Sequence, residues 1–173
     1  RSVSALVPYP GGKMEPMTAT LTSTGSTAAV IVTHQRAELL RASLEQVVHQ
    51  THPVQWVVVV DNGAEDAVRE LVESMAGDRG VYVPSETNLG GAGGFALGFL
   101  TALSLGADAV WCADDDGRPA DHTVLAELYR VAEANRLHEV SPAVCNIDDP
   151  GRLAFPLRLS LIHISEPTRP LYI

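Results

Sequence analysis

The chain of 173 residues is long enough for one domain with a hydrophobic core, and its apolar fraction of 46% is typical of a soluble globular protein. Its formal net charge is −9 with only 12 basic residues, and no Lys/Arg stripe could follow a phosphate backbone, which argues against nucleic acid as a partner. No apolar run approaches the roughly 20 residues that span a bilayer. Because Cys112 and Cys145 fit reduced thiols, we expect a cytoplasmic protein.

Residues 1–27 are rich in Pro, Gly, Ser and Thr without a sustained apolar period, which predicts a disordered lead-in. From Ala28 onward, short apolar runs alternate with amphipathic segments. This alternation predicts strands at 28–33, 54–60, 81–83 and 109–113 and helices at 37–50, 65–77, 93–106 and 122–135. The strands are apolar throughout, as in a parallel sheet covered by helices on both faces. The expected fold class is therefore a doubly wound, mostly parallel α/β domain.

The last segment, 159–173, continues neither the helical nor the strand period. Its string "SLIHISEPTR" looks like the translation of a sequencing adapter. We therefore predict a non-native tail at 159–173 and expect 28–158 to be an incomplete subdomain of a truncated chain.

Polar residues follow each predicted strand, in the segments 33–36 (THQR), 61–63 (DNG), 85–94 (SETNLGGAGG) and 114–119 (DDDGRP). In an open parallel sheet, the carboxyl ends of the strands share one edge, and ligands bind there. DNG is also a common turn, and His34 is an ordinary loop histidine, so both have a purely structural interpretation. Arg36 has one too, although a cation at this edge can pair with a phosphate.

The three adjacent aspartates, Asp114 to Asp116, form the more specific signal, because like charges repel and a helix cap needs only one of them. A hard divalent cation with oxygen ligands, Mg²⁺ or Mn²⁺, is the natural counter-charge. Asp114 and Asp116 are two residues apart and therefore point the same way at a strand end. They are the predicted metal ligands, and the alternative is a solvated acidic turn.

The glycine-rich segment contains G-x-G-x-x-A at Gly91, Gly93 and Ala96, which resembles a dinucleotide-binding fingerprint. It follows the polar stretch SETNL rather than a strand, so a closely packed helix start gives the same pattern. In either case a backbone with few Cβ atoms at a helix N-terminus lets a pyrophosphate or a sugar approach closely.

With these residues assembled, the sequence resembles the glycosyltransferases of family 2 with a GT-A fold. The strings that carry the resemblance are VVVVDNGAED, NLGGAGGFALGFLTALSLGADAVWCADDDGRP and EVSPAVCNIDDPGRLAFPLR, and they are similar to actinobacterial galactofuranosyltransferases that initiate cell-wall galactan. The resemblance implies transfer, with inversion, of galactofuranose from UDP-galactofuranose to a polyprenyl-diphosphate-linked rhamnosyl-N-acetylglucosamine acceptor. It also implies that the reaction takes place at the inner face of the cell membrane, with the full-length protein peripherally associated with that membrane.

The resemblance further assigns roles to residues of this sequence. Thr33 and Arg36 match the first nucleotide-binding loop, Asp61 matches a uridine contact, and Asp114 and Asp116 match the metal-binding ends of the D-x-D motif. The remaining matches lie beside the nucleotide sugar, with Asp115 expected to touch the sugar itself: Asn88, Gly90, Gly91 and Asp115.

An inverting displacement needs a base that deprotonates the acceptor hydroxyl. The family places that base in an acceptor-binding half, so we expect it beyond the end of this chain. Two alternatives stay open at this point. One is a phosphatase of the haloacid-dehalogenase type, which also has D-x-D-G after a strand, and the other is a non-enzymatic Rossmann-type nucleotide-binding module built on Gly91–Ala96.

Overall fold

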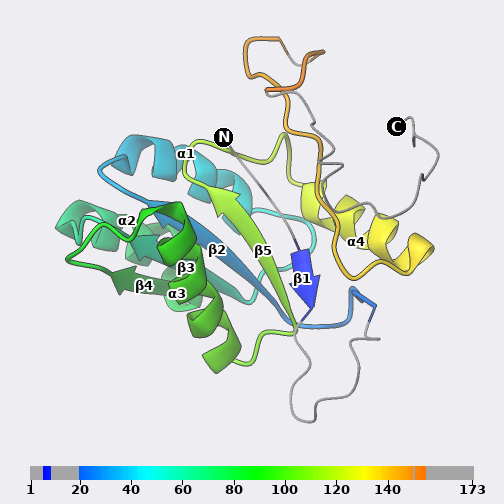
Figure 1. Ribbon diagram of the computed structural model, residues 1–173, viewed down its shortest axis with the longest axis horizontal. Coiled ribbons are helices and arrows are strands. Elements are labelled where there is room, and N and C mark those ends of the chain that lie inside the picture. The colour runs from blue at the N-terminus through cyan, green and yellow to red at the C-terminus, as the bar shows by residue number, and fades with distance from the viewer. Residues whose placement is uncertain (1–5, 9–19, 150, 155–173) are drawn as a thin grey trace, which may run out of the picture.

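The computed structural model describes residues 6–8, 20–149 and 151–154. Its sheet has five strands in the order β1-β5-β2-β3-β4 (Figure 1). The strands are β1 (Leu6–Pro8), β2 (Thr27–Thr33), β3 (Trp56–Asp61), β4 (Gly80–Pro84) and β5 (Ala109–Asp114). The helices are α1 (Ala37–Val48), α2 (Asp66–Ala76), the short 3₁₀ helix η1 (Gly77–Arg79), α3 (Gly90–Ser104) and α4 (Val124–Asn135).

The four strands β2 to β5 run parallel, and β1 pairs with β5 in the antiparallel direction. In this register Thr33 lies beside Asp61 on β3, and Val32 lies beside Asp114 on β5. The carboxyl ends of the central strands therefore meet at one edge of the sheet. The predicted class, a doubly wound and mostly parallel α/β domain, is confirmed.

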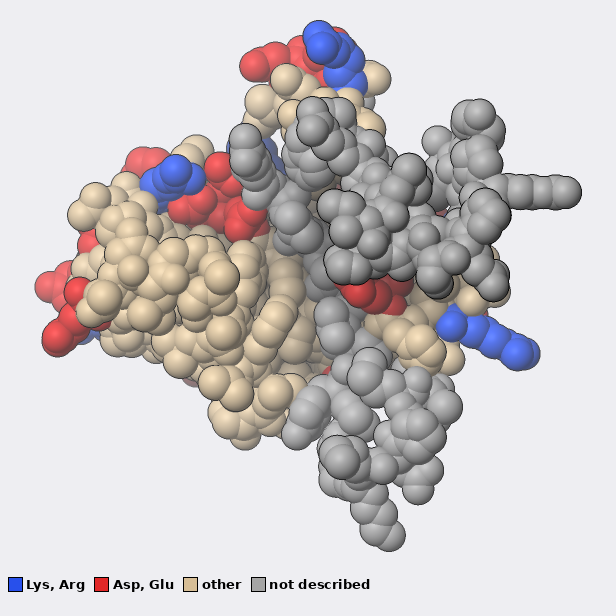
Figure 2. Space-filling model, viewed as in Figure 1, with Lys and Arg blue, Asp and Glu red and all other residues tan. Residues whose placement is uncertain are grey.

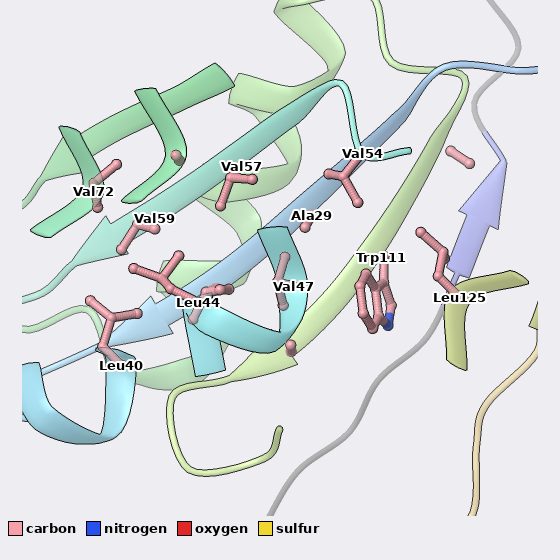
Figure 3. Close-up of a cluster of buried hydrophobic side chains, with 14 of the residues drawn as sticks. Ala29, Leu40, Leu44, Val47, Val54, Val57, Val59, Val72, Trp111 and Leu125 are labelled. Atoms are coloured by element: carbon pink, nitrogen blue, oxygen red, sulfur yellow. The ribbon is translucent and has the colours of Figure 1, made fainter. Parts of the chain in front are cut away.

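Successive residues of the apolar strands face opposite sides of the sheet, so each strand contributes to two hydrophobic clusters. On one side, alternate residues such as Ile31, Val59 and Trp111 pack against α1, α2 and α4, with Leu44 of α1 fully buried among them (Figure 3). On the other side, residues such as Val30 and Val58 pack against α3. Burial on both faces explains why the strands have no polar alternation.

The close packing of α3 against the sheet depends on two of its glycines. A Cβ at Gly94 would lie 2.5 Å from Cγ1 of Val32, and a Cβ at Gly98 would lie 2.3 Å from Cγ1 of Val30. Both distances are far shorter than van der Waals contact, so only glycine lets the helix axis come this near to β2. This packing fixes where the first turn of α3 lies relative to the strand ends.

The structure differs from the predicted lead-in, 1–27, at two places. Leu6–Pro8 forms the edge strand β1, and Leu21 is buried at 2% exposure in the core, with its N–H donating to the carbonyl of Leu137. The few apolar residues of this segment stand among Ser and Thr and do not recur at helical or strand spacing. For this reason the sequence pattern indicated disorder there. The predicted tail, 159–173, lies outside the described residues.

The third helix begins earlier than predicted, at Gly90 instead of Gly93, so part of the glycine-rich segment is helical rather than loop. Beyond α4, Cys145 pairs with Leu153 across a short antiparallel bridge. Among the helices of the described ranges, none has both the length and the apolar character needed to cross a membrane.

Candidate functional site

A cavity of about 340 Å³ opens at the edge of the sheet where the parallel strands end. Charged side chains of both signs gather near that end of β5, whereas the surface over α3 is uncharged (Figure 2). Four segments line the cavity: the end of β2 and its loop, the turn after β3, the start of α3 and the end of β5. The lining residues are Val32, Thr33, His34, Arg36, Asn62, Asn88, Gly90, Gly91, Asp114, Asp115 and Asp116.

All but one of the predicted site residues therefore line the same cavity. The middle aspartate of the three is turned inward: Asp115 is only 6% exposed, and the hydroxyl of Thr33 donates to its Oδ2 at 2.8 Å. Nη1 of Arg36 lies 3.4 Å from Oδ1 of Asp115 and also 3.4 Å from Oδ2 of Asp116. Thr33 and Arg36 thus fix and partly neutralise Asp115, which the sequence analysis had assigned to the sugar.

The loop that carries Arg36 turns sharply just before α1. Gln35 has φ = 56°, a left-handed conformation that non-glycine residues seldom adopt. This turn brings the guanidinium of Arg36 back over the aspartates. His34, on the same loop, lines the cavity, and its buried Nδ1 has no hydrogen-bond partner in the described part of the chain. One loop histidine carries no specific signal, so the sequence does not mark His34 as a cavity residue.

The glycines of the glycine-rich segment serve two different purposes, an open cavity and close packing within the helix. Gly90 has φ = 65°, and nothing lies within 4 Å of a Cβ built on Gly90 or Gly91, so both leave the cavity open. By contrast, a Cβ on Gly93 would lie 2.7 Å from Cβ of Leu89, so Gly93 serves the fit of the helix to its own first turn. The spacing that resembled a dinucleotide fingerprint therefore combines two unrelated requirements. The N-terminus of α3 lies at the cavity through Gly90 and Gly91, and the positive end of its helix dipole suits this place to anions.

Asp61 is the predicted site residue that does not line the cavity. It is fully buried, and its carboxylate accepts hydrogen bonds from the N–H of Gly63 at 2.8 Å, the N–H of Glu65 at 2.7 Å and the hydroxyl of Tyr82 at 3.0 Å. Burial, followed by the hydrogen bond to Asp61, raises the pKa of Tyr82 to about 12. In the structure Asp61 braces the turn between β3 and α2.

Asn62 is the cavity residue that the sequence analysis assigned only to a turn. It is 4% exposed, and its side-chain amide binds the backbone where α3 begins: Nδ2 donates to the carbonyl of Gly90, and Oδ1 accepts from the N–H of Leu89, both at 3.3 Å. The DNG pattern shows a turn, but it does not show that Asn62 reaches a helix start 28 residues later in the chain.

Asp114 and Asp116 both line the cavity and offer carboxylate oxygens to a cation. Within the described residues, no group of three or more His, Cys, Asp or Glu side chains is arranged to hold a metal ion. Mg²⁺ usually takes one or two protein carboxylates and fills its other positions with water and substrate phosphates. The pair therefore fits a cation that a phosphate ligand helps to hold, rather than a cage made by the protein alone.

Fold and site together define a doubly wound α/β domain with a cavity at the carboxyl edge of its parallel sheet, the place where open sheets of this class bind ligands. The glycosyl transferase family 2 matches residues 28–170, and the chain belongs to this family. The family assignment decides against the phosphatase and the Rossmann-type module. The match also includes most of the segment 159–173, whose non-native origin stays a prediction.

Two mycobacterial proteins are similar to this chain along most of its length. Galactofuranosyltransferase GlfT1 of Mycolicibacterium smegmatis is 56% identical over 142 residues, which are 82% of this chain and 47% of that protein. Galactofuranosyltransferase GlfT1 of Mycobacterium tuberculosis (strain H37Rv) is 55% identical over 141 residues, which are 80% of this chain and 46% of that protein. The chain thus spans about half the length of these curated relatives.

Two solved structures are similar in fold. The crystal structure of S. aureus TarS matches with a TM-score of 0.50 and 21% identity, over 63% of this chain and 20% of that one. Mannosyltransferase PcManGT from Pyrobaculum calidifontis, in complex with GDP-Man and Mn²⁺, matches with a TM-score of 0.49 and 23% identity, over 76% of this chain and 38% of that one. The likeness to TarS and the family assignment together support the expected GT-A fold.

Proposed function

We propose that this chain forms the nucleotide-sugar-binding half of a galactofuranosyltransferase, with UDP-galactofuranose as its donor. The observation that carries the proposal is the cavity that Asp114 and Asp116 line together with the glycine-rich start of α3. Carboxylates hold a divalent cation, and an open helix N-terminus attracts a phosphate, so the cavity has complementary partners for a metal diphosphate. The identity of 56% and 55% to the two galactofuranosyltransferases supports the choice of donor sugar.

In this proposal Asp114 and Asp116 hold Mg²⁺ or Mn²⁺, and the other lining residues bind the donor. The bound cation supplies positive charge that stabilises UDP as a leaving group. Arg36 adds a cation on the same side, and Gly90 and Gly91 leave room for the diphosphate or the sugar. Thr33 contributes by holding the buried Asp115, which keeps the neighbouring carboxylates directed toward the cavity.

The reaction that we propose is the transfer, with inversion, of galactofuranose to a polyprenyl-diphosphate-linked rhamnosyl-N-acetylglucosamine acceptor in cell-wall galactan synthesis. Such an acceptor places the full-length protein at the inner face of the cell membrane, in peripheral association with it. Deprotonation of the acceptor hydroxyl needs a general base. The carboxylates of this cavity are assigned to the cation and to Arg36, so we place the base in the half of the relatives that this chain does not span.

Calorimetry tests the donor site directly. UDP is titrated into the chain with and without Mn²⁺, and we expect binding that depends on the metal. Asp116→Asn is expected to weaken UDP binding at least about tenfold, because a cation ligand is lost. Asp78→Asn is the matched control, since Asp78 is an exposed carboxylate on η1, outside the cavity. Metal-independent UDP binding, or an unchanged affinity in Asp116→Asn, contradicts the site as proposed.

The sugar is tested on the complete protein, with the acceptor present. UDP release from UDP-galactofuranose is compared with release from UDP-galactopyranose, which differs only in the ring form of the sugar. We expect turnover with the furanose donor and little with the pyranose donor. Equal turnover would show that the choice of donor sugar is wrong while leaving the UDP site intact.

A further inference from the structure

We propose that Asn62 is a positioning residue that fixes the glycine-rich turn at the start of α3 and thereby sets the width of the cavity. Asn62 is buried directly after β3, and its side-chain amide forms hydrogen bonds to the backbone of that turn. The role deepens the proposed function, because it concerns the same cavity, but the structural part of the inference does not depend on what the cavity binds.

The turn before α3 needs an anchor because it lies on the surface. Residues 86–91 are all exposed, and Leu89 is 42% exposed despite its apolar side chain. Its internal hydrogen bonds, such as the N–H of Gly90 to Oδ1 of Asn88 at 2.8 Å, shape the turn without tying it to the sheet. An exposed turn held only by its own bonds is free to open locally.

Asn62 supplies the tie from a rigid position. It follows β3 directly, and its N–H donates to the carbonyl of Thr33 at 2.9 Å, which locks its backbone to the end of β2. Its two side-chain atoms then bind the carbonyl of Gly90 and the N–H of Leu89. A side-chain amide that bonds with both its donor and its acceptor fixes direction as well as distance.

A continuous chain of hydrogen bonds therefore joins the two walls of the cavity. Asp115 accepts from the hydroxyl of Thr33 at 2.8 Å, Thr33 accepts through its carbonyl from Asn62 at 2.9 Å, and Asn62 donates to Gly90 at 3.3 Å. The side of the cavity formed by the aspartates and the side formed by Gly90 and Gly91 are therefore connected by the same set of hydrogen bonds. If Asn62 is replaced, the aspartates keep their support from Thr33, whereas the glycine turn loses its side-chain bonds to the end of β3 and keeps only the packing of α3 against β2.

The first test is hydrogen exchange at the amide of Leu89, which donates to Oδ1 of Asn62. In Asn62→Leu, a change of similar volume, we expect this amide to exchange at least about tenfold faster. Thr27→Val is the matched control: it removes a buried hydroxyl that bonds to Tyr129 at the opposite end of β2, and it leaves the exchange of Leu89 unchanged. Unchanged exchange in Asn62→Leu overturns the inference. If this variant does not fold, Asn62→Ala, which adds no bulk, takes its place.

The second test separates positioning from general loss of stability. We expect Asn62→Leu to weaken UDP binding in Mn²⁺ about tenfold, while its affinity for Mn²⁺ alone, followed by electron paramagnetic resonance, stays within about twofold. Thr27→Val should keep both affinities at a comparable drop in Tm. Equal losses of UDP binding in the two variants overturn the positioning role. If the unaltered chain binds no UDP, the proposed function fails, and the exchange experiment alone decides the role of Asn62.

Discussion

At the scale of single residues, the three aspartates have different surroundings despite being adjacent. Asp115 is buried and bonds to Thr33 and Arg36, whereas Asp116 is 37% exposed and shares the guanidinium of Arg36. A charged group near 3.4 Å from two carboxylates lowers their mutual repulsion even without another cation. The sequence showed that a counter-charge is needed, and the structure shows that the chain provides one of its own.

Arg36→Met tests whether this guanidinium also serves the ligand. Arg36 is 53% exposed and Asp116 is 37% exposed, so water screens their ion pair, and the buried Asp115 keeps its hydrogen bond from Thr33 when Arg36 is removed. A diphosphate in the cavity would be a stronger partner, and we expect the variant to bind UDP about tenfold more weakly, with Tm nearly unchanged. Arg130→Met, which removes an exposed arginine paired with Glu127 on α4, is the control in the same calorimetric titration. Equal UDP affinity in both variants would contradict a ligand role.

At the scale of elements, α3 needs glycine for two different reasons, close packing against β2 and an open cavity. The sequence alone does not show which glycine serves which purpose. Gly94 and Gly98 face β2, where a Cβ has no room, and Gly90 and Gly91 face the cavity. The clustering of glycines could be recognised from the sequence. Which of them touch the sheet depends on how the helix is rotated about its axis, and that rotation is set by tertiary packing.

A pair of alanine substitutions separates the two demands. In Gly98→Ala the new Cβ would lie 2.3 Å from Val30, and we expect a loss of about 1–3 kcal/mol in the free energy of unfolding, measured by urea denaturation. In Gly91→Ala nothing lies within 4 Å of the new Cβ, so stability should be kept or slightly raised, as usual for alanine in a helix. UDP affinity should fall in Gly91→Ala instead. A stability loss at Gly91 equal to that at Gly98 would contradict the division.

Strands and helices with a strong apolar period could be predicted to within a few residues, because their burial repeats regularly. The observed β3 (Trp56–Asp61) and α2 (Asp66–Ala76) lie within a residue or two of the predicted 54–60 and 65–77. The structured part of 20–26 could not be predicted in this way. Leu21 is the one buried residue of that segment, and one apolar residue among Ser and Thr has no period.

Leu21→Ala measures how much that segment contributes to folding. Leu21 is 2% exposed in the cluster that contains α4, and its removal leaves a cavity in the core. We expect the free energy of unfolding to fall by about 2–5 kcal/mol in urea denaturation. Leu100→Ala, at a position 65% exposed on α3, should change it by less than about 0.5 kcal/mol. If the two variants were equally stable, the segment would not belong to the core.

At the scale of the whole molecule, the position of the site could be predicted better than its internal geometry. Parallel strands must end at one edge, so the polar segments after β2, β4 and β5 were expected to meet, and they line one cavity. Side-chain direction is decided by packing after the strands are in place. For this reason Asp61 turns to its own loop, while Asn62, which the sequence analysis assigned only to a turn, spans the gap to α3.

The segment before β2 is also tied to the rest of the molecule by two carboxylates, which makes stability depend on pH. Asp108, before β5, accepts from the N–H and the hydroxyl of Ser26, both at 2.8 Å, and these bonds lower the pKa of Asp108. Glu133 on α4 accepts from the N–H and the hydroxyl of Ser23, which lowers the pKa of Glu133. All four hydrogen bonds favour the charged carboxylates in the folded chain.

A pKa that is lower in the folded than in the unfolded chain gives stability that is fully present above the unfolded value and is lost as pH falls through the folded one. We therefore expect Ser23→Ala/Ser26→Ala to be less stable than the unaltered chain at pH 7. The difference should shrink as pH falls below the ordinary carboxyl values of 4.5 for Glu and 3.8 for Asp. Urea midpoints between pH 7 and pH 3 measure it. Every other residue is the same in the two chains, so the difference isolates the two serine hydroxyls. A difference that stays constant across this range would show that the serine hydroxyls do not act through the two carboxylates.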